Sequence, residues 1–333
     1  MSKLSAMFQR LKAERRAAFI PFFAAGDPDL ETTKDLLRSA GKSGADAIEV
    51  GVPFSDPIAD GPVIQAAFHR SLERGFQVAH VFDLAQRLRR EGFETPLLCM
   101  VSYTLVFHRR AGIGPWALGF GGATGKAKPN AQSLMPKARD GVRTFLTLCK
   151  RAGYDGAIIP DLPAGYEGEA SAVAGELGLD LIFLMAPTTT PERRELIIQR
   201  SRGFIYYVSV AGITGTNLED SFRSQVSSFK LTAPAAQPET RNLKLETFFD
   251  GLALNVRSIK ERTGTPVCVG FGIAQPEQAA AVAACADGVI VGSALVKKVD
   301  EAIARGLSGA ALLQHVEPLL KAFADACHGK AQV

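Results

Sequence analysis

The sequence predicts an α/β fold, a (β/α)8 TIM barrel that forms a single domain over residues 1–333. Eight short apolar runs alternate mostly with helical patterns, and each run is continuous rather than alternating in polarity. Continuous apolar strands are typical of a parallel sheet covered by helices. Eight such units in one chain favour closure into a barrel over an open doubly wound sheet.

The expected strands are the apolar runs themselves, at residues 19–25, 46–50, 96–101, 156–159, 180–184, 204–208, 266–269 and 288–291. Periodicity and helix-start signals predict helices at residues 1–16, 32–43, 62–74, 78–91, 141–152, 167–177, 191–200, 245–263 and 276–285, followed by two more to about residue 327. The extra N-terminal helix has one apolar side, formed by Leu4, Met7, Phe8 and Leu11, so it is expected to pack on the fold.

Two long segments interrupt this rhythm. Residues of about 108–140 follow the third strand, and residues of about 216–244 follow the sixth. Loops of such length in a compact domain are either functional or disordered. The second segment contains the sequence TAPAAQP at 232–238, which is typical of a flexible linker.

Composition and charge exclude several classes of protein. The chain carries a formal charge of +4, but residues 108–140 alone carry +5, so the basic charge is local and predicts no nucleic-acid surface. No apolar stretch reaches the length of a membrane span or a secretion signal, and a cytoplasmic protein is expected. The five cysteines show no paired spacing, which predicts neither a disulfide framework nor a zinc site.

The stretch 46–62 carries the strongest chemical signal. Glu49 replaces an aliphatic residue at the end of an apolar strand, and Asp56 and Asp60 follow on a proline-rich loop. Two carboxylates in different environments can hold different protonation states, as general acid–base chemistry requires. The alternative is that Glu49 faces water and the two aspartates are ordinary loop residues.

Glycines follow the last two strands. Gly270, Phe271 and Gly272 come after the seventh strand, and Gly292 and Ser293 come after the eighth, where a helix begins. In a barrel these two loops form the usual phosphate site, since backbone N–H groups and a helix N-terminus attract an anion. A tight turn would explain either glycine cluster alone.

Several motifs together resemble the alpha subunit of tryptophan synthase. They are PFFAAGDP at 21–28, ADAIEVGVPFSDPIADGPVIQ at 45–65, IIPDLP at 158–163, YVSVAGITG at 207–215, GFGI at 270–273 and IVGSALV at 290–296. This resemblance implies a lyase of tryptophan biosynthesis that cleaves indole-3-glycerol phosphate to indole and glyceraldehyde 3-phosphate. It also implies no cofactor in this chain. The indole would pass to a pyridoxal-phosphate-dependent beta subunit in an α2β2 complex.

The resemblance also assigns roles to individual positions. Glu49 matches the general acid–base, Asp60 the second catalytic carboxylate, and Tyr206 a tyrosine beside Glu49. The phosphate-binding positions are matched by Gly215, Phe271, Gly272, Gly292 and Ser293. The substrate pocket is matched by Phe22 and Thr214, and the side that meets the beta subunit by Pro53, Asp56 and Asp161. No residue is expected to bind a metal.

Residue patterns alone leave some of these positions open. Tyr206 and Tyr207 are neighbours on a strand and must point to opposite faces, but the pattern does not say which one is packed. Phe22 is more often a core residue than a pocket residue. Asp161 follows a strand and could also cap a helix.

Three other functions compete with the alpha-subunit lyase. A different phosphosugar barrel is disfavoured by the pair Glu49 and Asp60 within PFSDPIADGP. A catalytically weak subunit that activates its partner stays open because the segment 216–244 is long where the family has a closing lid. A stand-alone lyase stays open because the segment 108–140 could block docking, whereas a partner-contacting arm anchored by Trp116 is the opposite hypothesis for the same segment.

Overall fold

The computed structural model of the chain describes residues 1–56, 60–107, 140–209, 238–270 and 272–329. Within these ranges the strands are β1 (Ala18–Ala24), β2 (Ile48–Gly51), β3 (Leu97–Met100), β4 (Gly156–Ile158), β5 (Asp180–Ile182), β6 (Leu184–Met185), β7 (Ile205–Val208), β8 (Val267–Gly270) and β9 (Gly288–Val291). The helices are α1 (Lys3–Ala13), α2 (Leu30–Lys42), α3 (Pro62–Glu73), α4 (Val78–Arg90), α5 (Tyr103–Phe107), α6 (Asp140–Ala152), α7 (Ala170–Leu177), α8 (Pro191–Arg200), α10 (Pro238–Lys260), α11 (Pro276–Ala283), α12 (Ser293–Ala304) and α13 (Gly309–His328).

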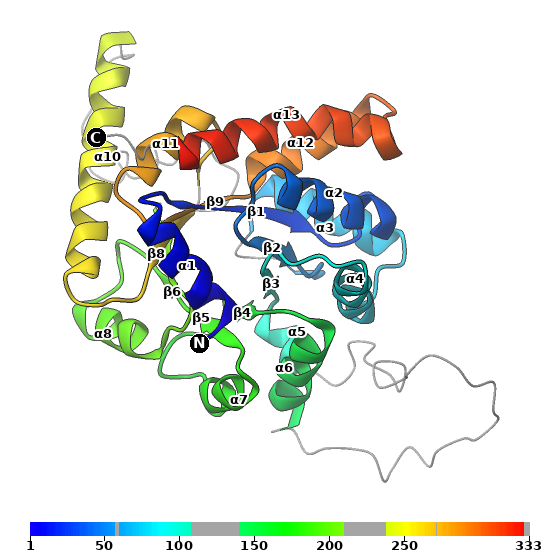
Figure 1. The fold of residues 1–333 in the computed structure, drawn as a ribbon, viewed down its shortest axis with the longest axis horizontal. Helices are drawn as coiled ribbons and strands as arrows, with labels where there is room; N and C mark the ends of the chain where they lie inside the picture. The colour runs from blue at the N-terminus through cyan, green and yellow to red at the C-terminus, as the bar shows by residue number, and fades with distance from the viewer. Residues whose placement is uncertain (57–59, 108–139, 210–237, 271, 330–333) are drawn as a thin grey trace, which may run out of the picture.

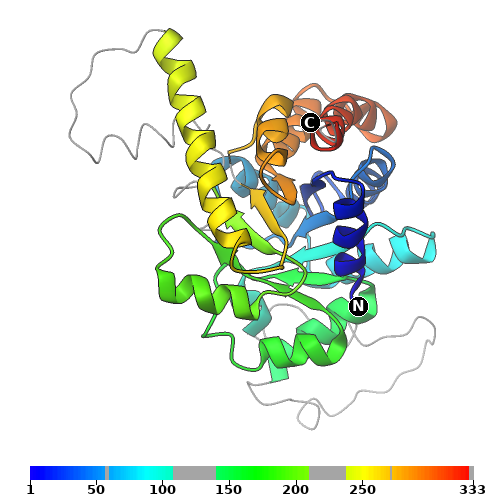
Figure 2. The ribbon, with the colours of Figure 1, turned by 60° about the vertical axis from the view of Figure 1, so that its left-hand side comes forward.

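The strands form one nearly closed parallel barrel. Their order is β5-β4-β3-β2-β1-β9-β8-β7-β6, so the first strand pairs with both the second and the last. The two ends of this sheet, β5 and β6, are consecutive in the chain and separated by Phe183. The helices surround the sheet (Figures 1 and 2), and the predicted barrel is confirmed while the open sheet is excluded.

One expected strand is divided. Residues 180–184 were expected to form a single strand, but β5 pairs with β4 whereas β6 pairs with β7. The break at Phe183 comes where the chain changes its hydrogen-bonded neighbour, and the Phe183 carbonyl already accepts the Tyr206 N–H at 3.1 Å. The division is therefore the point at which the barrel closes.

Two helices differ from expectation. Helix α10 begins at Pro238, although residues 212–245 were expected to be irregular; proline suits a first helical turn because it needs no N–H partner there. The short helix α5 was not expected. It forms because the Ser102 hydroxyl accepts the Thr104 N–H and the Asp161 carboxylate accepts the Tyr103 N–H. The segment 108–139 with Trp116, and residues 210–237, lie outside the described residues.

The core has two layers on the two sides of the sheet. Inside the barrel, the four apolar residues of α1 meet inward-facing strand residues, which include Ile20, Leu98, Ile158 and Ile290. Helix α1 thus covers one end of the barrel (Figure 1), as its apolar side predicted. The larger layer lies between the strands and the surrounding helices. Among the described residues, no helix combines the length and the hydropathy that a membrane-spanning segment needs.

A buried carboxylate joins the two ends of the chain. Asp46, which is 6% exposed, accepts the Phe19 N–H at 3.0 Å and an Arg16 N–H at 3.0 Å, and its Oδ2 lies 2.9 Å from His328 Nε2. Burial raises the pKa of Asp46, but the bonds from His328, Phe19 and Arg16 outweigh it and hold this pKa below its ordinary value. Asp46 therefore stays ionised and links α1, β1 and α13.

Replacement of Asp46 by alanine should leave the Arg10 and Arg16 guanidinium groups, the His328 ring and the Phe19 N–H without their shared acceptor. We expect Asp46→Ala to lower the free energy of unfolding by about 3 kcal/mol, as for other broken buried ion pairs. Urea denaturation at pH 7 measures this. Asp35→Ala, which removes a more exposed pair with Arg38 within α2, should cost less than about 1 kcal/mol. Equal losses in the two variants would contradict the role given to Asp46.

Candidate active site

Glu49 is the second residue of β2 and lines a cavity inside the barrel. Its side chain is 1% exposed, and neither carboxyl oxygen has a hydrogen-bond partner among the described residues. Val50 and Gly51 continue the pairing with β3, so the strand ends one residue later than the expected range 46–50. The alternative that Glu49 faces water is wrong.

Asp60 reaches the same cavity from the loop before α3. It is half-buried, and its backbone carbonyl accepts the side-chain amide of Gln65 at 2.7 Å. The two carboxylates thus come from a rigid strand and from a loop, and they line one cavity of about 640 Å³. This volume lies within the range of small-molecule sites.

The two carboxylates titrate differently. Burial, and after it the charge of Asp60, raises the pKa of Glu49 to about 8. Burial raises the pKa of Asp60 to about 6. At neutral pH the cavity therefore holds a protonated Glu49 beside an ionised Asp60, so a proton donor and a negative charge are available together.

Aromatic rings complete the wall next to Glu49. Phe22 on β1 and Tyr206 on β7 both line the cavity, whereas Tyr207 packs in the outer layer. Burial, with smaller effects of the Glu49 and Asp60 charges, raises the pKa of Tyr206 well above its ordinary value, so its hydroxyl keeps its proton. A Cβ on Gly270 would lie 2.7 Å from the Tyr206 hydroxyl, so only glycine leaves room for this ring.

The glycine-rich end of the cavity lies at the start of α12. Gly292 is the N-cap of this helix and Ser293 its first residue, and both line the same cavity as Glu49. Gly272 lines it too, with a φ of +78° that favours glycine. Helix N-terminal N–H groups and glycine backbone can hold an anion here. Thr214, Gly215 and Phe271 lie outside the described residues.

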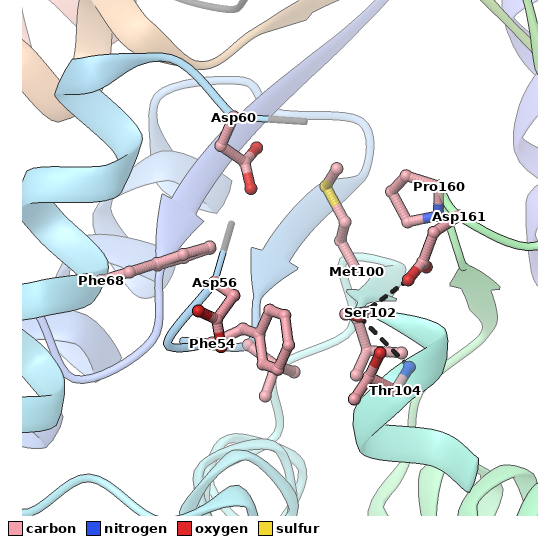
Figure 3. A pocket seen from close by; sticks show the side chains of 11 residues that line it. Phe54, Asp56, Asp60, Phe68, Met100, Ser102, Thr104, Pro160 and Asp161 are labelled. Carbon is pink, nitrogen blue, oxygen red and sulfur yellow. Dashed lines mark hydrogen bonds between the residues drawn. The ribbon is translucent and has the colours of Figure 1, made fainter. Parts of the chain in front are cut away.

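A second cavity adjoins the first. Asp60 and Met100 line both, and the second continues past Phe68 and Phe54 to Asp56 and Asp161 (Figure 3). It holds about 570 Å³.

Asp161 has a defined local role at this second cavity. Its carboxylate accepts the Ser102 hydroxyl at 2.8 Å and the Tyr103 N–H at 2.7 Å, as Figure 3 shows for Ser102. It therefore caps α5 on the neighbouring unit rather than a helix that follows its own strand. Asp56 is exposed and accepts the Ser55 hydroxyl, while Pro53 is buried.

Sequence reasoning missed Met100, Ile64 and Phe68. Met100 is the last residue of β3 and lines both cavities, so its place at a strand end was the available signal. Ile64 and Phe68 lie on α3, and Phe68 packs against Phe22 with ring centroids 6.5 Å apart. Helical periodicity marks them as apolar, but it does not separate a core position from a cavity wall. The described residues contain no group of His, Cys, Asp and Glu arranged to hold a metal ion.

Comparison with known proteins gives consistent matches. A family model described as "Tryptophan synthase alpha chain" matches residues 8–113, 133–239 and 245–325. The tryptophan synthase alpha chain of Rhodopirellula baltica is 36% identical over 340 aligned positions, which cover 100% of this chain and 98% of the relative. That of Synechocystis sp. is 36% identical over 302 positions, covering 90% and 92%.

Solved structures agree with the sequence relatives. The crystal structure of tryptophan synthase subunit alpha from Legionella pneumophila superposes with a TM-score of 0.73 and 29% identity, covering 99% of each chain. A structure of Mycobacterium tuberculosis tryptophan synthase superposes with a TM-score of 0.71 and 29% identity, covering 98% of each chain.

The buried, unpaired Glu49 should make the stability of the fold depend on pH. Because its folded pKa of about 8 lies above the ordinary value of 4.5, folding takes up a proton between these pH values, and stability falls as pH rises through this window. Glu49→Gln removes the titrating carboxyl group and with it this pH dependence. We expect the variant to match the parent chain near pH 4.5 and to exceed its free energy of unfolding by about 2–5 kcal/mol at pH 8.5.

Denaturant unfolding at the two pH values measures the difference. The control is Glu94→Gln, which removes a carboxylate whose side chain is 85% exposed and should change stability by less than about 1 kcal/mol at either pH. A Glu49→Gln variant that gains nothing at pH 8.5 would mean that Glu49 ionises freely in the folded chain.

Proposed function

The chain belongs to the tryptophan synthase alpha chain family, and on this premise we propose that Glu49, Asp60 and Tyr206 carry out its carbon–carbon bond cleavage. The reaction of this family converts indole-3-glycerol phosphate to indole and glyceraldehyde 3-phosphate. The observation that carries the proposal is that two carboxylates of different pKa face one cavity whose other end is the N-terminus of α12.

Glu49 is the proton shuttle. Its protonated carboxyl gives a proton to indole C3, which turns the ring into a cationic indolenine. The resulting carboxylate then takes the proton of the hydroxyl on the carbon attached to C3. That oxygen forms the aldehyde, the bond between C3 and this carbon breaks, and its electron pair restores the neutral indole. No oxidant or reductant is needed, and Glu49 ends protonated, ready for the next cycle.

Asp60 stabilises the charge that appears on the ring nitrogen during this step. An ionised carboxylate at this position interacts more strongly with the cationic intermediate than with the neutral substrate, which lowers the barrier rather than merely tightening binding. Tyr206 acts as a hydroxyl donor beside Glu49. This role is supported by its raised pKa, which keeps the hydroxyl protonated, and by its close packing on Gly270.

The substrate phosphate is assigned to the N-terminus of α12. Gly292, Ser293 and Gly272 line that end of the cavity, and the helix dipole favours a dianion there. The same proposal places Thr214, Gly215 and Phe271 at the phosphate and substrate, and Phe22 against the substrate. Phe22 is supported by its position on the cavity wall.

The alpha chain of this family needs no cofactor of its own, and pyridoxal phosphate belongs to its partner, the tryptophan synthase beta subunit. The adjoining cavity lined by Asp60 and Met100 offers indole an apolar route toward Asp56 and Asp161. We assign this side, with Pro53, to the docked beta subunit in an α2β2 complex.

A single-domain organisation and a cytoplasmic location belong to the same proposal. The pairing of β1 with β9 ties the two halves of the chain into one sheet, which supports one domain over residues 1–333 with insertions at about 108–140 and 216–244. The five cysteines are free thiols, as is usual in a reducing compartment.

Removal of each carboxylate tests the proposal. With the beta subunit present, we expect Glu49→Gln to lower kcat for indole release by about 10³-fold, because it removes the group that gives and takes the proton. Asp60→Asn should lower kcat by about 10²-fold, because it removes only charge stabilisation. Single-turnover release of indole from indole-3-glycerol phosphate measures both effects.

The same assay separates the competing functions. Slow release by the parent chain alone that rises with the beta subunit is the expected result. Fast release whose rate does not change when the beta subunit is added would identify a stand-alone lyase. No release in either case would favour a subunit that only activates its partner.

The rate should have a bell-shaped dependence on pH. Asp60 must be ionised and Glu49 protonated, so kcat should fall below about pH 6 and above about pH 8. Asp60→Asn should remove the acid limb. It should also move the alkaline limb to lower pH, because the Asp60 charge contributes to the raised pKa of Glu49. A kcat profile that stays flat from pH 5 to 9 in saturating substrate would contradict these roles.

A further inference from the structure

Arg70 joins three parts of the barrel that are far apart in sequence. It lies in the last turn of α3, and its Nε and Nη2 donate to the two carboxylate oxygens of Asp27 at 3.0 and 2.9 Å. Its Nη1 donates to Asp300 of α12 at 2.8 Å. Asp27 follows β1 and is only 4% exposed, so this bidentate pair is anchored to the barrel itself.

The two helices that Arg70 connects pack against each other, and both line the Glu49 cavity. Helix α3 begins two residues after Asp60 and contributes Val63 and Ile64 to the wall. Helix α12 contributes Ser293 at its first turn. The position of α3 relative to α12 therefore sets the distance between Asp60 and the phosphate end of the cavity.

Apolar packing alone does not fix that distance. Ile64 and Phe68 of α3 meet Val296 of α12 in a small cluster, together with Phe22. Such contacts are non-directional and contain no hydrogen bond or ion pair of their own. A planar guanidinium that is bonded to two carboxylates in a fixed geometry restricts the sliding of one helix against the other. The Ser71 hydroxyl, which donates to the Ala25 carbonyl at 2.7 Å, adds a second tie between α3 and the end of β1.

We propose that Arg70 is a positioning residue of the lyase reaction, which holds the Asp60 helix against the phosphate-binding helix through Asp27 and Asp300. This inference rests on the proposed function, since it assigns Asp60 and α12 to the two ends of one substrate. A displacement of about 1 Å between groups that act on one substrate can cost about 10²-fold in rate. Arg70 is not among the described residues that line the cavity, so it would affect kcat through the two helices, whereas Asp300 is part of the cavity wall.

Asp300→Asn gives the cleanest test, because the Asp300 side chain is 54% exposed and the buried pair with Asp27 stays intact. With the beta subunit present, we expect kcat to fall by about 5- to 10-fold while the melting temperature changes by less than about 2 °C. Inhibition by inorganic phosphate, which reports the phosphate end of the cavity and not Asp60, should stay within about twofold. The matched control is Asp325→Asn, which breaks an exposed pair with Lys321 within α13 and should leave kcat unchanged.

Arg70→Lys provides a second variant that keeps the charge but not the bidentate geometry. We expect it to recover most of the stability lost in Arg70→Met while kcat stays about 10-fold low or lower. Recovery of both stability and kcat would show a purely structural role and overturn the proposal. A parent chain that releases no indole would overturn the proposed function and this inference together. An active parent with normal kcat in Asp300→Asn would overturn the Arg70 role alone.

Discussion

The burial of an unpaired carboxyl group inside the barrel is the constraint on which the site depends. Glu49 has no hydrogen-bond partner among the described residues, so its neutral form is strongly favoured. A carboxyl group at the surface would be ionised at neutral pH and useless as a proton donor. Glu49 thus occupies a core position where an aliphatic side chain would add stability. The rest of the core must compensate for that loss.

Small residues on the neighbouring strands make room for the side chains that surround Glu49. Gly51 at the end of β2 and Gly270 at the end of β8 leave space for the rings of Phe22 and Tyr206, respectively. These rings exclude water around the Glu49 carboxyl and leave the cavity open toward Asp60 and α12. The pKa of Glu49 is thus a property of several strands and not of its own sequence neighbours.

Local patterns predicted the elements better than the contacts between them. Continuous apolar runs predicted the barrel, and the run around Glu49 marked the site, because both signals are local. Alternation along β7 established that Tyr206 and Tyr207 face opposite ways, but only the closed sheet decides which side is the interior. The capping of α5 by Asp161 and the link from Arg70 to Asp300 join residues 58 and 230 positions apart, and no local periodicity encodes such pairs.

The pairing of β1 with β9 also has a consequence during synthesis. The edge of β1 that pairs with β9 has no partner until residues 288–291 have been synthesised. An apolar strand therefore has unpaired backbone groups for most of translation. Such an edge invites association between nascent chains.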